Sequence, residues 1–180
     1  MNKKKLLILS AAVAMLVLAL VLMVMRGGGE KNPDNTHTST LDTKAVSKKE
    51  MENIITKVIH NETITGEELP MSQQYANAIL NAISYEIIES DEFGKAVVKF
   101  TYIDAMKMAD TYGTVSNSDD FYAFCIQQIQ NNVAPLVEAT IEVEYRAAAD
   151  GSVEIVDSIA FADVLTGGAA SEFLKLLEGR

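Results

Sequence analysis

The chain begins with an unbroken apolar run, Leu6–Met25, in which Ser10 is the one polar residue. At about 1.5 Å per residue, a helix of this length spans roughly 30 Å, the thickness of a bilayer core. Apolar side chains surround the whole axis of such a helix, whereas a surface helix of a soluble domain would carry a polar stripe. The pattern therefore predicts a transmembrane helix at residues 6–25 that binds the lipid bilayer.

The charges that flank this run predict its orientation. Lys3, Lys4 and Lys5 precede it, whereas the Arg26 that follows is soon countered by Glu30. Positive residues are retained on the cytoplasmic side of a membrane. We therefore expect a single-pass protein of the cell membrane with a cytoplasmic N-terminus and an extracellular C-terminal domain.

A cleaved signal peptide is the alternative interpretation of the run. Its apolar region would usually be about 7–15 residues long and would end in a small-x-small cleavage site. Residues 22–26 make a poor approach to such a site, although Gly27–Gly29 could be cut. We favour a retained anchor. Lipoprotein-type acylation is not expected, because no cysteine lies near the end of the run.

Beyond residue 44, apolar residues recur at the spacing of helices in five segments. The first carries Val46 to Ile59, with Ser47 and Glu50 as a possible capping box. Ser72 is the expected cap of the second, Asp104 begins a short third segment that runs to Tyr112, and Ser118 or Asp119 is expected to cap the fourth. The inward stripe of the fourth helix is expected to comprise Phe121, Phe124, Cys125, Ile129 and Val133, with Pro135 beyond it. Ala169–Glu178 is expected to form the closing helix.

Alternating apolar and polar residues predict strands between these helices. The expected strands lie around 85–88, at 96–103, at 140–146 and at 153–161, with turns at Asp91–Gly94 and Asp150–Gly151, and with Gly167–Gly168 ending the sheet region. Strands in antiparallel pairs with helices grouped between them predict an α+β fold, in which helices cover one face of a curved, cone-like antiparallel sheet. Glu142 and Glu144 predict that its other face is exposed to water.

These patterns divide the chain into three parts. Residues 1–26 form the anchor, residues 27–44 a flexible tether, and residues 45–180 one α+β domain. The tether is rich in glycine, asparagine and threonine and cannot bury apolar surface. Treated as a random coil, it separates its ends by about 20–25 Å. The domain is therefore expected to lie close to the membrane.

Charge and composition exclude several classes of function. All 25 acidic side chains follow the apolar run, against 15 basic ones in the whole chain, four of which flank that run. A surface this acidic repels phosphates, so we expect no nucleic-acid partner. A single cysteine excludes an internal disulfide and a cysteine-based zinc site.

No residue pattern points strongly to catalysis. Cys125 is expected to be a buried thiol rather than a nucleophile, and Asp119 and Asp120 are expected to stabilise a helix N-terminus. Asp104 and Asp110 could both face a pocket, but we consider this a minor alternative. His60 has no second histidine at the spacing of metal ligands. We therefore predict no catalytic, cofactor-binding or metal-binding residues.

Two polar segments have weaker implications. Asn61–Thr63 matches a glycosylation sequon, a pattern that is common by chance. An uncharged polar cluster in the fourth helical segment is best explained as a solvated face, with a protein contact surface as the alternative. This cluster comprises Gln127, Gln128, Gln130, Asn131 and Asn132.

The order of two segments is similar to a known superfamily. Val97–Asp104 runs from a strand into a helix, and Asp150–Ile155 leads to Phe161 and then to Leu165–Gly168. This order resembles the extracytoplasmic domains of unknown function on Gram-positive bacterial surfaces that belong to the nuclear-transport-factor-like, cystatin-like cone superfamily, over about residues 45–178. The resemblance implies a cone of helices against a bent sheet with a pocket between them. Superfamily members host binding, assembly and enzymatic functions alike.

The sequence thus favours a membrane-anchored extracytoplasmic binding or assembly module without catalytic activity. Its expected partner is another envelope protein or a small apolar ligand. Phe100, Tyr102, Ile141 and Tyr145 are the candidate lining residues of a pocket, although ordinary core packing explains them better. A cone-fold enzyme with an aspartate base such as Asp104 is one alternative. A pilin-like structural subunit is another, disfavoured because the run lacks a preceding processing glycine and an internal acidic residue.

Overall fold

The computed structural model of the chain describes residues 47–61, 63, 65–66, 68–91, 94–113, 117–147 and 153–178. The predicted anchor, the predicted tether and the expected Asp150–Gly151 turn lie outside these residues. None of the helices in the described ranges combines the length and the apolar composition that crossing a bilayer requires.

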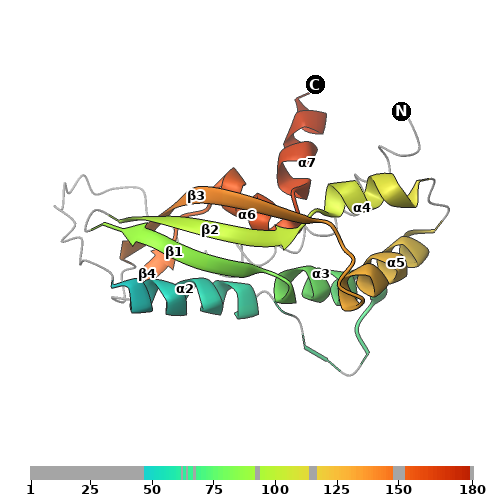
Figure 1. Cartoon of the computed structure of the whole chain (residues 1–180), viewed down its shortest axis with the longest axis horizontal. Helices are drawn as coiled ribbons and strands as arrows, with labels where there is room; N and C mark the ends of the chain where they lie inside the picture. The colour runs from blue at the N-terminus through green and yellow to red at the C-terminus, as the bar shows by residue number, and fades with distance from the viewer. Residues whose placement is uncertain are drawn as a thin grey trace, which may run out of the picture.

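The described residues form an α+β fold, as predicted, with six helices and four strands (Figure 1). The strands form one antiparallel sheet in the order β1-β2-β3-β4. In chain order the elements are α2 (Lys48–Asn61), α3 (Met71–Asn81), β1 (Ser84–Ser90), β2 (Lys95–Ile103), α4 (Ala105–Tyr112), α5 (Ser118–Gln130), β3 (Leu136–Ala147), β4 (Val153–Ile155), α6 (Ile159–Thr166) and α7 (Ala169–Leu177).

The sheet register assigns each alternating side chain to one of two faces. Val98 of β2 is paired with Ile87 of β1 and with Ile141 of β3, so these three apolar residues share the inner face. Lys99 lies opposite Glu86 and Thr140 on the outer face. A register shift around Ile88 marks a bulge in β1, and the Ile88 side chain is exposed there.

The inner face of the sheet packs against α2 and α6 to form the larger core cluster. Phe100 and Val98 of β2 have no exposed surface, and the Phe100 ring lies beside the rings of Tyr85 and Phe161. Burying a side chain such as Phe100 stabilises the fold by about 1.5–3 kcal/mol. The helices of this cluster lie on one face of the sheet, as the alternation along β3 predicts.

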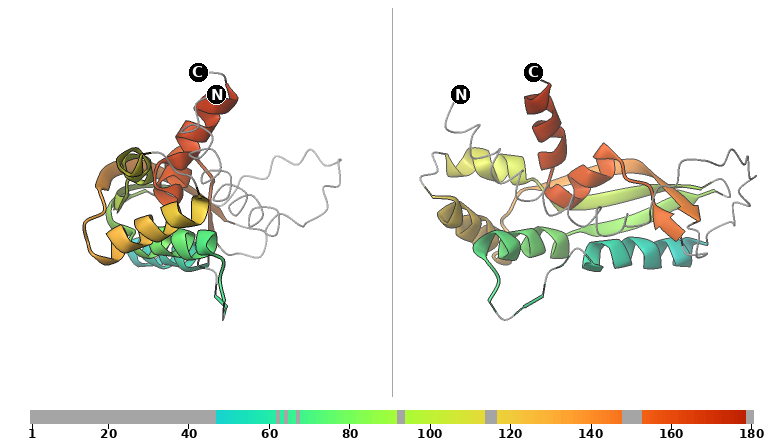
Figure 2. Two further views of the ribbon diagram at one scale, coloured as in Figure 1. Left: turned by 90° about the vertical axis from the view of Figure 1, so that its right-hand side faces the viewer. Right: turned by 180° about the vertical axis from the view of Figure 1, so that it is seen from behind.

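A second core cluster joins α3, α4 and α5 beyond the end of the sheet where β2 finishes and β3 begins (Figures 1 and 2). The rings of Tyr75 and Tyr122 are stacked with their centroids 5.2 Å apart, and Phe121 meets Tyr75 edge to face. Such aromatic pairs add about 0.5–1.5 kcal/mol to the effect of burial alone. The helical end of the domain therefore has an aromatic interior of its own.

Two of the predicted helix starts are confirmed. The Ser47 N–H donates to Glu50 Oε2 over 2.9 Å and the Glu50 N–H donates to Ser47 Oγ over 3.3 Å, which is the predicted capping box of α2. Asp104 caps α4, because its carboxylate accepts a 2.8 Å hydrogen bond from the Lys107 N–H. These polar contacts satisfy N–H groups that a helix leaves without partners.

Two other predicted caps are wrong by one or two residues. The N-cap of α3 is Pro70 rather than Ser72, since the Pro70 carbonyl oxygen already accepts hydrogen bonds from the next turn. The N-cap of α5 is Asn117 rather than Ser118 or Asp119, because the Asn117 side chain accepts from the Asp119 N–H over 3.0 Å. Asparagine is as good a cap as serine or aspartate.

The strand predicted at 153–161 begins where expected but is much shorter than predicted. β4 covers only Val153–Ile155, and Phe161 lies in α6. Ser158 caps α6 by accepting a 3.1 Å hydrogen bond from the Phe161 N–H. Val133 likewise leaves the predicted inward stripe, because α5 ends at Gln130 and the Val133 side chain is exposed.

Candidate functional surface

The two aspartates considered for a pocket lie at opposite ends of α4. Asp104 is its N-cap and Asp110 lies in its last turn. Six residues at about 100° each place the two positions roughly 120° apart around the helix axis. The structure does not bring them together, and the carboxylate of Asp104 holds the N–H of Lys107. Capping therefore accounts for Asp104.

Cys125 lies in the second core cluster with no exposed surface, as predicted. Burial raises the pKa of its thiol to about 12, and the smaller effect of a hydrogen bond with Tyr75 acts in the opposite direction. The pKa of the Tyr75 hydroxyl is also raised, first by its own burial and then by Cys125. A thiol that stays protonated near neutral pH is a weak nucleophile.

The four candidate pocket residues share the inner face of the sheet. Phe100, Tyr102 and Tyr145 are buried and Ile141 is half-buried, all within or against the larger core cluster. The Tyr145 hydroxyl donates to the backbone oxygen of Asp91 over 2.5 Å. Burial is the main reason that the pKa of Tyr102 is raised. Core packing therefore accounts for all four residues.

The amide cluster lies at the end of α5. Gln127, Gln130, Asn131 and Asn132 are exposed and Gln128 is half-buried. Asn132 has a positive φ of 56°, and the Gln128 carbonyl oxygen accepts hydrogen bonds from Val133 and Ala134. Part of the cluster thus ends the helix, since asparagine tolerates the left-handed conformation that this end requires.

The described residues hold no group of three or more histidine, cysteine, aspartate or glutamate side chains that could bind a metal ion. His60 occupies the last turn of α2, where it is exposed.

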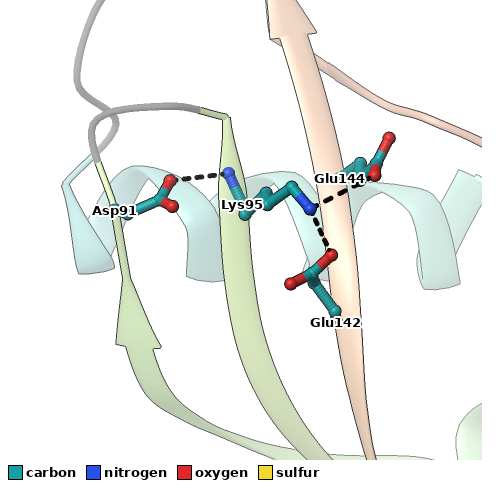
Figure 3. Close-up of polar contacts among 4 residues, drawn as sticks. All are labelled: Asp91, Lys95, Glu142 and Glu144. Atoms are coloured by element: carbon teal, nitrogen blue, oxygen red, sulfur yellow. Dashed lines mark hydrogen bonds and ion pairs between the residues drawn. The ribbon is translucent and has the colours of Figure 1, made fainter.

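The outer face of the sheet carries a ladder of paired charges. Lys95 Nζ lies 2.6 Å from Glu142 Oε1 and 3.7 Å from Glu144 Oε1, as Figure 3 shows. The backbone N–H of the same lysine donates to Asp91 Oδ1 over 2.9 Å. Its hydrogen bond with Glu142 is the main reason that the pKa of Lys95 is raised. One lysine of β2 thus connects the β1–β2 turn to β3.

The ladder continues along the sheet in both directions. Lys99 pairs with Glu138 at 3.0 Å, and Arg146 lies 3.9 Å from Glu154 of β4. Each of these side chains is at least two-fifths exposed. Exposed ion pairs stabilise a protein little, so the charges matter more for what can approach this face than for the fold.

A second surface is formed by α7, which projects away from the rest of the domain (Figures 1 and 2). Gly167 and Gly168, both with positive φ, form the junction between α6 and α7. Leu177 near its end is exposed, while Phe173 and Leu176 are half-buried.

The cross-strand pairs of the ladder were not among the sequence-predicted candidates. The available signal is the spacing of like charges within each strand, which is two or four residues and so places them on one face. These residues are Lys95 and Lys99 in β2 and Glu138, Glu142 and Glu144 in β3. The register that pairs them could not be obtained from this spacing, because two helices separate β2 from β3.

Comparison with known proteins gives no relative: no family model, no curated protein and no solved structure matches the chain.

Proposed function

We propose that this chain is a single-pass membrane protein whose acidic domain acts outside the cell membrane as a binding or assembly module without catalytic activity. The observation that carries the proposal is the apolar run Leu6–Met25, with three lysines before it and a polar tether after it. The two core clusters support a domain that folds on the far side of that tether, because they are built from residues 51–165.

A binding role is supported by where the chemically capable residues lie. The Asp104 carboxylate caps a helix, and the Cys125 thiol is buried with its pKa raised. The enzyme alternative with Asp104 as a base has less support, since a general base needs its carboxylate within reach of a substrate proton. The exposed charge ladder and α7 offer surfaces for a partner.

Membership of the cystatin-like cone superfamily remains part of this proposal. Helix α2 contacts both β1 and β4, which are the two edges of the sheet. In a flat sheet these edges would be three strand spacings, or about 14 Å, apart. A helix that contacts both edges supports a sheet curved around it, as the cone fold requires.

Protease accessibility in cells tests the proposal. The full chain carries a C-terminal epitope tag, and intact cells are treated with a protease that cannot enter them. We expect the epitope to be lost from protease-treated intact cells. In untreated cells, the chain should remain with the membrane at its full mass under alkaline extraction. An epitope that survives until the cells are broken would refute the topology. A matched variant, Lys3→Glu with Lys4→Glu and Lys5→Glu, should reduce the exposed fraction.

A further inference from the structure

Strand β3 has a long edge that no strand of the described chain covers. It pairs with β2 continuously from Leu136 to Glu144, but with β4 only from Tyr145 to Ala147. Along Leu136–Val143, its second edge therefore lacks a strand partner within the described residues. An uncovered edge presents a row of backbone donors and acceptors to which another strand can add.

Two hydrogen bonds fix which backbone groups point toward this edge. The Tyr145 N–H donates to the Gly94 oxygen over 2.7 Å, on the β2 side. The Glu144 oxygen accepts from the Val156 N–H over 2.8 Å, on the β4 side. Backbone groups alternate along a strand, and the register with β2 shows no shift. The N–H and C=O groups of Glu138, Thr140 and Glu142 therefore point to the uncovered edge.

The side chains beside this edge form two rows of different chemistry. On the inner face, Val137, Ala139 and Ile141 are only half-buried, although they pack against the larger core cluster. On the outer face, the Glu138 and Glu142 side chains are 63% and 52% exposed, and they pair with Lys99 and Lys95 of β2. Helix α6 also packs on the inner face. An added strand would thus place one row of its side chains beside this apolar face and the other row beside carboxylates.

We propose that the β3 edge binds an extended peptide segment of a protein partner, with basic residues at alternate positions and apolar residues between them. Strand addition supplies backbone hydrogen bonds, and the two side-chain rows supply the selectivity. A second copy of this chain fits poorly, because antiparallel pairing centred on Thr140 would place Glu138 opposite the Glu142 of the other copy. This inference rests on the proposed binding function and specifies the class of partner.

Binding of a synthetic peptide to the full chain in detergent micelles tests the inference. The probe is a labelled peptide of alternating lysine and valine, and an alternating glutamate and valine peptide is its counterpart. Fluorescence anisotropy measures binding, and amide hydrogen exchange locates it. We expect the probe to protect the amides of Glu138, Thr140 and Glu142. The amides of Ala139 and Ile141 point toward β2 and should exchange slowly with or without the probe.

Substitution of the central edge residue tests the backbone contact. Thr140→Pro removes a donor that points away from β2, so the ladder within the sheet keeps its hydrogen bonds. We expect this variant to bind the lysine probe at least about tenfold more weakly, and Thr140→Val to bind it normally. Equal binding by the proline variant, or slow exchange of the Thr140 amide before any peptide is added, would overturn the inference.

Charge reversal provides a test that does not depend on how the proline variant folds. Glu138→Lys with Glu142→Lys should reverse the preference between the two peptides. Glu86→Lys, on the outer face of β1 at the far side of the sheet, should leave that preference unchanged. If the β1 variant changed the peptide preference as much as the β3 variant, the attraction would be nonspecific and the inference would be overturned. A failed topology assay with intact edge binding would instead contradict the proposed location alone.

Discussion

The backbone N–H of Ala105 donates a 3.1 Å hydrogen bond to the carbonyl oxygen of Gly167, which joins the start of α4 to the α6–α7 junction. The contact is close because Gly167 has no side chain. A Cβ at position 167 would lie 2.7 Å from Ala105 Cβ and 2.8 Å from the Ile103 oxygen. The path of the chain from α6 into α7 thus requires glycine both for its φ of 65° and for space.

Gly167→Ala should therefore destabilise the domain more than backbone strain alone would, because the added Cβ would also overlap its neighbours. We expect a loss of about 2–4 kcal/mol in the free energy of unfolding, measured by urea denaturation, because strain and overpacking add. Gly168→Ala is the matched control. Its φ of 85° is also left-handed, but the nearest atom to a Cβ there would be Met106 Cγ at 3.8 Å, so a loss of only about 1 kcal/mol is expected. Equal losses in the two variants would contradict the role of close packing at Gly167.

Asp104→Ala should remove the cap of α4. The expected cost is about 1 kcal/mol, whereas Asp104→Asn should retain most of the stability because an asparagine oxygen accepts the same hydrogen bond from Lys107. Thermal unfolding of both variants measures the difference. If Asp104→Asn were as unstable as Asp104→Ala, its carboxylate would have a role beyond capping.

Tyr145→Phe should cost about 1 kcal/mol in the free energy of unfolding, because the Asp91 oxygen loses a donor from the Tyr145 hydroxyl. The ring stays in the core, so no cavity forms. Tyr85→Phe is a useful comparison, since the Tyr85 hydroxyl contacts both Thr56 and the Glu52 oxygen and its removal should cost at least as much. Chemical denaturation with an unchanged m-value checks both predictions.

Stability should fall at alkaline pH partly because of Cys125. The thiol ionises near pH 8.5 in an unfolded chain and near 12 in the folded one, so the folded state keeps a proton that the unfolded state loses. This contribution is complete below about pH 8.5 and decreases as the pH rises toward 12, by about 1.4 kcal/mol per pH unit at most.

The comparison with Cys125→Ala isolates this effect. Unfolding free energies between pH 9 and 10 should depend less on pH in the variant, because the buried tyrosines remain in both proteins. The native thiol should also resist alkylation at pH 8 and react on unfolding. Rapid alkylation of the folded protein would show that the thiol is accessible.

Regular periodicity made most of the fold predictable. The alternation along β2 and the helical spacing of Met51, Ile55 and Val58 reflect burial on one face, which is what the structure shows. The strand predicted at 153–161 was too long because the apolar positions of this segment also alternate. In the structure, Ser158 caps a helix and Phe161 packs on Phe100. Tertiary contacts decide whether a short apolar segment forms a helix or a strand, and the sequence of the segment does not reveal those contacts.

The candidate surface was less predictable than the fold. Exposed glutamates on β3 followed from the alternation, but their lysine partners depend on the register between β2 and β3. That register is a long-range property, fixed where the inner-face side chains of both strands meet the helices. Among the described residues, the part of the β3 edge without a strand partner depends likewise on how early β4 ends, and β4 is the strand whose length was predicted wrongly.

The division of the interior into two clusters has a consequence for how the domain opens. Helix α3 and strand β2 each contribute to both clusters, while α4 and α5 belong to the second alone. Detachment of those two helices would leave the sheet with its own interior intact. The domain should therefore contain two cooperative units of unequal stability, so that its helical end can open without global unfolding.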